Sequence, residues 1–238
     1  MNIQALLANE FKLTAAQVLA TVQLINDGNT IPFIARYRKE ATGGIDDVTL
    51  RDFDERLTYL KNLETRKEEV IRLIDEQGKL TTELQDEIEK ATVLQRVEDL
   101  YKPYKKKRAT RASKAKDAGL EPFAMTIFEQ ALTSGDPVEL ANAYINAEGG
   151  FPDAITTLQG ASDIIAEMIA DDADITAELR EWTRKTGLIV SEATNPDEKT
   201  VYEMYYEFSE PLIKIPNHRI LAINRGESEE KLKVKIDV

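Results

Sequence analysis

Cysteine is absent from this chain of 238 residues, and histidine occurs only once. The absence of cysteine excludes a disulfide framework, a thiolate metal site and a cysteine nucleophile. With His218 as the lone imidazole, neither a two-histidine metal site nor a serine and histidine pair with a spare base can be assembled. We expect His218 to be a partly buried structural residue beside a strand.

Long apolar runs and glycine-rich phosphate loops are also missing. No apolar run approaches the ~20 residues that a helix needs to cross a bilayer, and the first residues show no basic segment followed by an apolar one. Carboxylates are abundant, but their spacings are those of solvated salt bridges on helix surfaces. We therefore expect a cytoplasmic, non-enzymatic protein with no membrane partner and no cofactor.

Three aspartates, Asp171, Asp172 and Asp174, stand close enough together to suggest a site for a hard cation. A calcium loop needs a glycine and a distal glutamate at fixed spacing, and neither is present. A simpler interpretation is that these carboxylates cap a helix over residues 175–186, in which Trp182 should be buried. We expect no metal site.

Positive charge is scarce and concentrated. The chain carries 31 Lys and Arg against 43 Asp and Glu, a formal net charge of −12. The stretch from Tyr101 to Lys116, here called the basic window, holds eight of the cations and no acid. The rest of the chain therefore has 23 cations against 43 acids, a formal charge of −20. Crowded cations repel one another unless an anion approaches, and a nucleic-acid backbone is an anion with closely spaced charges.

The basic window has two interpretations, which the sequence leaves open. In one, its cations contact phosphates, and Tyr101 and Tyr104 on either side of Pro103 stack on bases or sugars. In the other, the cations pair with the chain's own acidic helices and the tyrosines brace the loop. Because Pro103 lacks an amide donor and restricts the residue before it, a helix should end there. The window should then be a connector, with Ser113 capping a further turn.

Most of the chain shows the three- and four-residue apolar spacing of helices, so we predict a mainly α fold. Thr14 and Gln17 have the spacing of a capping box at a helix start. Residues 49–77 predict a strut helix roughly 40 Å long, with its apolar stripe interrupted around Glu64 and Lys67. Further helices are predicted over residues 2–8, 82–91, 93–101, 120–132, 137–147 and 152–170.

A short helix is predicted between Thr30, as its cap, and Gly43, because Pro32 sits at an early position that needs no amide donor. One side of this helix is apolar, and the other presents Arg36 and Arg38. Guanidinium groups there could bind phosphate or be tied to neighbouring carboxylates.

The pattern changes after Gly187. Residues 200–212 predict a helix with clustered tyrosines. Residues 220–224 then predict a strand, a turn follows around Gly226, and alternation up to Val238 predicts a second strand. Such a C-terminal β-hairpin is marginal alone and should dock on helices. We therefore divide the chain into a helical domain, residues 1–187, and a mixed segment, residues 188–238.

Three stretches carry a family resemblance: TIPFIARYRKEATGG at Thr30 to Gly44, LYKPYKKKRATRASKAKDAGLEPFA at Leu100 to Ala124, and SEPLIKIPNHRILAINRGE at Ser209 to Glu227. Together they resemble the N-terminal part of the Tex family of bacterial transcription accessory proteins. The resemblance implies a fragment of a longer protein, which in family members continues with an RNase H-like domain, a helix-hairpin-helix region and a C-terminal RNA-binding OB-fold. It also implies a helix-turn-helix-like arrangement among the helices.

These observations support two functions. In the first, the chain is the helical N-terminal module of a Tex-like transcription accessory factor, with RNA or DNA as its partner and the transcription machinery as a further one. Its cations contact the nucleic-acid backbone without reading sequence, or support binding by the domains that follow. The candidate contacts are Arg36, Arg38, Lys105, Lys106, Lys107, Arg108 and Arg111. In the second, the helices form a protein-docking scaffold without nucleic-acid contact. No pattern indicates an oligomeric state.

Overall fold

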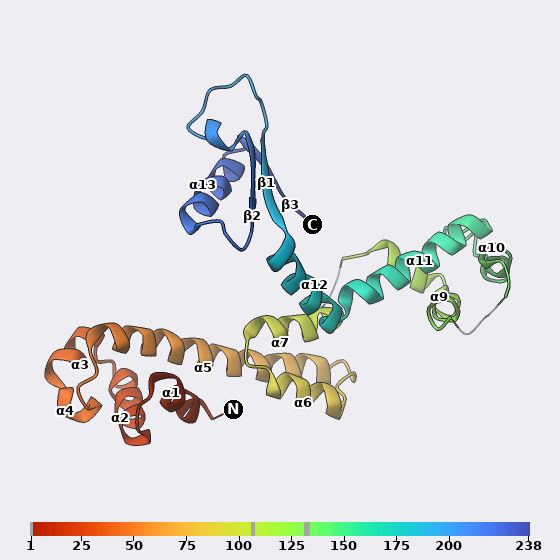
Figure 1. Cartoon of the computed structure of the whole chain (residues 1–238). Coiled ribbons are helices and arrows are strands. Elements are labelled where there is room, and N and C mark those ends of the chain that lie inside the picture. Colours follow the sequence, from red (N-terminus) through yellow and green to blue (C-terminus); the bar gives the residue numbers. More distant parts are fainter. Residues whose placement is uncertain (1, 106–107, 131–133) are drawn as a thin grey trace. The chain divides into compact units, whose positions relative to one another are not determined.

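The computed structural model describes residues 2–105, 108–130 and 134–238 (Figure 1). The chain divides into two compact units, residues 1–107 and 108–238, and each is described by itself. Helices dominate both units, which confirms the predicted mainly α fold. Among the described helices, none is long and apolar enough to cross a membrane. The predicted division at residue 187 and the helix-turn-helix-like arrangement stay predictions.

The first unit is all helical. Its elements are α1 (Ile3–Phe11), α2 (Ala15–Asn26), α3 (Ile31–Tyr37), α4 (Lys39–Thr42), α5 (Asp47–Asp75), α6 (Thr82–Lys90), α7 (Leu94–Tyr101) and the 3-10 turn η1 (Lys102–Tyr104). The predicted capping box is confirmed at the start of α2. The Gln17 amide donates to Thr14 Oγ1 at 3.3 Å, and the Thr14 amide donates to Gln17 Oε1 at 2.9 Å.

Helix α5 is the strut that the sequence predicts. Its 29 residues span about 44 Å, and Asp46 caps it by accepting from the amides of Val48 and Thr49. Its first half packs on α1 and α2 through Phe53 and Leu57, and its second half contacts α6 and α7.

The apolar stripe of α5 is interrupted by polar Glu64 and Lys67, but burial continues through the interruption. Lys67, whose side chain is only 4% exposed, continues the stripe between buried Leu63 and Val70. Its ammonium reaches Glu64 Oε1 at 2.9 Å and donates to the carbonyl of Glu89 at 2.9 Å, near the end of α6. A lysine takes a core position here because its apolar stem packs inward and its charged end finds two oxygen partners.

The second unit contains helices and a small sheet. Its elements are α8 (Arg111–Asp117), α9 (Glu121–Phe128), α10 (Pro137–Ala141), η2 (Asn142–Tyr144), α11 (Ala154–Asp171), α12 (Ala173–Thr186), β1 (Leu188–Ala193), η3 (Glu203–Tyr205), β2 (Glu207–Pro211), α13 (Asn217–Ser228) and β3 (Leu232–Asp237).

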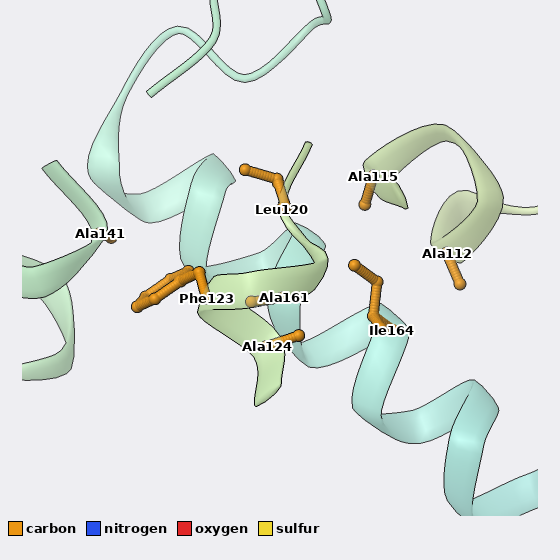
Figure 2. Packing of buried hydrophobic residues seen from close by; sticks show 8 residues of the cluster. All are labelled: Ala112, Ala115, Leu120, Phe123, Ala124, Ala141, Ala161 and Ile164. Carbon is orange, nitrogen blue, oxygen red and sulfur yellow. The ribbon is translucent and has the colours of Figure 1, made fainter. Parts of the chain in front are cut away.

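The core around α11 is built largely from small side chains. Figure 2 shows its buried members: Ala112, Ala115, Leu120, Phe123, Ala124, Ala141, Ala161 and Ile164. Alanines on α8 and α11 let the two helices approach closely. Gly160 of α11 leaves room for two other neighbours, because a Cβ there would lie 2.6 Å from the Phe151 ring and 2.7 Å from Leu120 Cδ1.

Helix α12 confirms one prediction and corrects another. Asp172 caps it by accepting from the amides of Asp174 and Ile175 at 3.0 and 2.8 Å. Trp182, predicted to be buried, is 50% exposed. No residue of this helix is buried.

The C-terminal hairpin prediction is corrected by a three-stranded antiparallel sheet in the order β2-β1-β3. The strand predicted at residues 220–224 lies inside α13, and the helix predicted at residues 200–212 is a turn followed by β2. Only the second predicted strand is confirmed, as β3. His218 was expected to be partly buried beside a strand. It is instead exposed, in the first turn of α13. Figure 1 shows α13 alongside the sheet, and Ile223 of α13 shares a buried cluster with Ile189 and Leu232 of the sheet.

Candidate functional site

The seven predicted phosphate contacts fall in three places. Arg36 and Arg38 lie at the end of α3, Lys105 follows η1 in the first unit, and Arg108 and Arg111 belong to the second unit. The remaining two, Lys106 and Lys107, lie outside the described residues.

Arg36 and Arg38 are exposed, and neither forms an ion pair with a residue that the structure describes. The Arg38 guanidinium lies 5.5 Å from the centre of the Phe33 ring. Arg36 lines a hollow of about 580 Å³ together with Lys39 and Asp46. Hydrogen bonds from Thr49 lower the pKa of Asp46, so this carboxylate is already occupied in capping α5.

Lys105 already has an intramolecular partner. Its ammonium lies 2.5 Å from Glu98 Oε2 and 5.5 Å from the centre of the Tyr101 ring. Glu98 also accepts from Arg66 of α5 at 2.6 Å. The hydrogen bond from Arg66 is the largest effect that lowers the pKa of Glu98; burial opposes it, and Lys105 adds to it.

Tyr101 braces this network instead of standing free. Its ring also lies 5.3 Å from the Arg66 guanidinium. For Tyr101 and Lys105, the geometry favours the intramolecular alternative that the sequence left open.

The predicted cations of the first unit do not form one patch. Ile34 of α3 packs on Leu50 at the start of α5. Lys105 instead pairs with Glu98, which is bound by Arg66 well along the same helix. The 16 residues from Leu50 to Arg66 correspond to about 24 Å of helix. In Figure 1, α3 and α7 accordingly meet different parts of α5.

In the second unit, α8 presents cations on a firmly anchored element. Thr110 caps α8 by accepting from the Ser113 amide at 3.0 Å, and its hydroxyl reaches Glu167 of α11 at 3.1 Å. The predicted cap, Ser113, instead sits three residues into the helix and accepts from the Thr110 amide at 2.9 Å. The basic window is therefore part helix and not wholly a connector.

Some of the cations on and before α8 form ion pairs and others do not. Arg111 is 84% exposed and lies 3.4 Å from Asp163. Lys116 lies 4.0 Å from both Glu121 and Glu167. Arg108 and Lys114 are exposed and form no ion pair within the described ranges.

Lys114 was not among the predicted contacts. It follows Arg111 by three residues, so the two side chains share one side of α8. That spacing is visible in the sequence and would have identified it. Arg108, Arg111 and Lys114 are therefore exposed cations on or just before α8.

The carboxylates of the described residues do not gather into a metal site. Those residues contain no group of three or more His, Cys, Asp or Glu arranged to hold a metal ion. The two carboxylates that lie deepest in the first unit have partners: Asp99 accepts from Gln95 at 3.0 Å, and Glu64 holds Lys67. The exposed cations on α8 can attract a polyanion.

Comparison with known proteins gives two family matches. The model described as Tex-like protein N-terminal domain matches residues 1–75, and the model described as Tex central region-like matches residues 133–238.

Individual relatives agree with these matches. The chain is 48% identical over 237 residues to Protein tex of Bordetella pertussis, which covers 99% of this chain and 30% of that protein. It is 40% identical over 241 residues to the Transcriptional accessory protein Tex of Neisseria gonorrhoeae, covering 99% of this chain and 31% of that protein. It is 32% identical over 233 residues to the human S1 RNA-binding domain-containing protein 1, covering 91% of this chain and 22% of that protein. The chain thus spans less than a third of the length of these relatives.

Proposed function

Because the chain belongs to the Tex family, whose N-terminal and central regions it matches, we propose that it is a module of a nucleic-acid-associated transcription accessory factor. In this proposal its free cations contact the phosphates of RNA or DNA without reading base sequence, and its role is not enzymatic. The names of its relatives support this assignment, since one is a transcriptional accessory protein and another contains an S1 RNA-binding domain.

The observation that carries the proposal is the state of the cations around α8. Arg108 and Lys114 are exposed without an ion pair to any described residue, although the chain has an excess of acids, 43 against 31 cations. Among the described acids, Arg111 pairs only with Asp163; its own side chain is 84% exposed and that of Asp163 is 14% exposed. A pair with so solvated a guanidinium contributes about 0 to 1 kcal/mol. A phosphate could therefore replace Asp163 at little cost.

The contribution of Arg36 and Arg38 is proposed to be secondary. They belong to the other compact unit and flank acids of α5, so their local potential is mixed. Lys105 would have to leave Glu98 to reach a phosphate, which makes it the weakest of the described candidates.

A salt titration tests the proposal. Binding of a fluorescein-labelled single-stranded RNA and of a DNA duplex is followed by fluorescence anisotropy from low to moderate salt. Arg108→Gln and Lys114→Gln should each weaken binding to every sequence and lower the log-log salt slope by about 1. Lys105→Gln should change the slope less. Lys79→Gln is the control. It makes the same charge change at an exposed cation between α5 and α6.

Two outcomes would overturn the proposal. One is that no binding is detected even at low salt. The other is that Arg108→Gln and Lys114→Gln bind as Lys79→Gln does, because the cations of α8 would then contribute nothing beyond net charge.

A docking scaffold is the second candidate function, and the exposed face of α12 favours it. Ile175, Leu179 and Trp182 recur at helical spacing and are 38%, 54% and 50% exposed. Apolar residues in such a row often mark a protein contact. If this alternative holds, the chain does not bind nucleic acid. It should instead associate with the remaining part of a full-length relative, and Leu179→Asp should abolish that association.

A further inference from the structure

The C-terminal sheet carries a hollow that the proposed function does not use. This groove, of about 840 Å³, is lined by Val190 and Glu192 of β1, by Glu207 and Phe208 of β2, and by Met204 beside them. Val190, Glu192 and Glu207 alternate with residues that face α13, so the groove lies on the side of the sheet that α13 leaves open.

One side of the groove is an open strand edge. In the order β2-β1-β3, strand β2 has a neighbour on one side only. The Ala193 amide donates to the Tyr206 carbonyl, and the Leu212 amide donates to the Gly187 carbonyl, both across β1 and β2. Because hydrogen-bonded pairs alternate in an antiparallel ladder, the amides of Glu207 and Ser209 point away from β1. They are donors available to another strand.

The groove is also acidic. Glu203 and Glu207 form no ion pair with any residue in the described ranges, and Glu192 has only Lys235 at 3.5 Å, with both side chains more than 60% exposed. Such an exposed pair is weak. Carboxylates at this density repel a nucleic-acid backbone and attract cationic side chains.

Exposed apolar side chains border the groove. Met204 is 74% exposed and Val201 is 86% exposed, which are high values for large apolar residues. Met204 also lines a second hollow of about 600 Å³ with Val201 and Leu221. An unbranched methionine adapts its shape to different apolar partners, so this rim can accept an aliphatic side chain.

From these features we propose that β2 and its groove bind an extended basic peptide segment of a protein partner by strand addition. The main chain of the peptide pairs with the amides and carbonyls of Glu207 and Ser209. Its Lys or Arg side chains meet Glu203 and Glu207, and an aliphatic side chain covers Met204. The site is separate from the cations of α8 and does not depend on them.

The edge ends in a residue that limits the length of the added strand. Pro211, the last residue of β2, has no amide to donate. Pairing therefore stops there, and the peptide can extend only toward Glu203. This places its charged side chains over the acidic end of the groove.

The test uses the full chain and a fluorescein-labelled eight-residue peptide in which lysine alternates with valine. Binding is measured by anisotropy. Two control peptides replace every lysine by glutamate, or carry N-methyl groups on alternate backbone amides. We expect the first peptide alone to bind. The variant with Glu203→Lys and Glu207→Lys should lose about tenfold or more in affinity. Its control has Glu227→Lys and Glu230→Lys, which make the same charge change on exposed residues outside the groove.

A second variant separates strand addition from simple charge attraction. Ser209→Pro removes an outward amide while leaving the ladder to β1 intact, since proline is tolerated at an edge strand whose amide faces solvent. It should weaken peptide binding several-fold without altering the melting temperature by more than a few degrees.

Three results would overturn the proposal. Unchanged binding by Ser209→Pro would mean attraction without pairing, or addition at the β3 edge. Equal binding of the N-methylated peptide would exclude a main-chain contact. Tighter binding of the acidic peptide or of single-stranded RNA at Glu203 and Glu207 would show that the groove takes a different class of ligand.

Discussion

At the scale of single residues, polar side chains in this chain act largely at helix ends. Side-chain oxygens accept from free first-turn amides at most of the longer helices, and the caps are Asn2, Thr14, Asp46, Thr81, Thr110, Asp136, Asp153 and Asp172. Each one satisfies donors that have no partner within the helix. Donor and acceptor are only two or three residues apart, yet local sequence did not identify every cap. Thr110 caps α8 where Ser113 was predicted, and the predicted cap Thr30 makes no side-chain hydrogen bond at the start of α3.

Thr14 gives the first prediction. Thr14→Ala removes the acceptor for the Gln17 amide and half of the capping box. The free energy of unfolding should fall by about 1 kcal/mol, measured by urea denaturation. Thr58→Ala is the matched control, because Thr58 is exposed in the middle of α5 and alanine is the better helix former. Equal stability of Thr14→Ala and the unsubstituted chain would refute the capping role.

Glu98 gives the second prediction, which concerns pH. Its pKa is lowered, chiefly by the hydrogen bond from Arg66, so in the folded chain it protonates only below the ordinary value of about 4.3. The stability that it contributes is therefore present above about pH 4.3 and is lost as the pH falls through the lowered native pKa. Glu98→Gln should be destabilised by about 1 kcal/mol at pH 7, and the difference should shrink toward pH 3.

Urea denaturation of both proteins at several pH values measures this difference. Glu55→Gln, at an exposed position of α5, controls for the loss of one negative charge. A penalty for Glu98→Gln that stays the same from pH 7 to pH 3 would contradict the role assigned to Arg66 and Lys105.

The sequence was enough to locate the candidate site, but it could not show which of its cations pair with acids of the same chain. Eight cations without an acid between Tyr101 and Lys116 are visible in the sequence alone. That Lys105 meets Glu98 while Arg108 meets no described acid depends on how α7 and α11 approach the window. Attraction between exposed charges is largely screened beyond roughly 8 Å at physiological salt, so the fold decides which cations remain available.

At the scale of elements, helices were predictable wherever one stripe of apolar residues packs on one neighbour. Helix α5 followed its pattern for 29 residues. Among the C-terminal elements that the sequence predicted, only β3 followed its local pattern, because apolar residues there are shared between a short helix and a sheet. Phe208 and Ile189 fit both periodicities over such short segments, and tertiary contacts decided the outcome.

Gly226 shows most clearly why the other C-terminal elements were predicted wrongly. The sequence suggested a turn, but Gly226 lies inside α13, where a Cβ would be 2.6 Å from Leu232 Cδ1 and 3.2 Å from the Tyr202 ring. Without a side chain at this position, the helix can lie close against β3. In the sequence, a glycine that permits such close packing looks the same as a glycine that forms a turn.

The third prediction follows from this contact. Gly226→Ala would stabilise an isolated helix by up to about 1 kcal/mol. Here it should instead destabilise the chain by about 1 to 3 kcal/mol, because buried Leu232 and Tyr202 must move. Asn224→Ala is the control on an exposed position of the same helix and should be neutral or slightly stabilising. Thermal melting compares the two. Stabilisation by Gly226→Ala would show that α13 does not pack tightly on β3.

At the scale of the whole molecule, the two compact units each contain their own buried clusters. In the first unit, Leu7, Phe53 and Leu60 form one such cluster. In the second, Phe123 and Ile164 belong to another. Apolar spacing could not show this division, since helical spacing recurs on both sides of it. The family resemblance predicted what kind of protein this is, but not where one core ends and the next begins.

The last prediction is that each unit folds by itself. Residues 1–107 and residues 108–238, expressed separately, should each give a helical far-ultraviolet spectrum and a cooperative melt, because each retains its own core. The residue-weighted sum of the two spectra should match that of the intact chain. A pair divided at residue 90 is the control, since that division separates α7 from α5 and should leave the first fragment less stable. An unfolded fragment from the division at residue 107 would mean that its core requires the other unit. If both fragments fold, the salt titration can be repeated on residues 108–238 alone, where Arg108, Arg111 and Lys114 lie without the acids of the first unit.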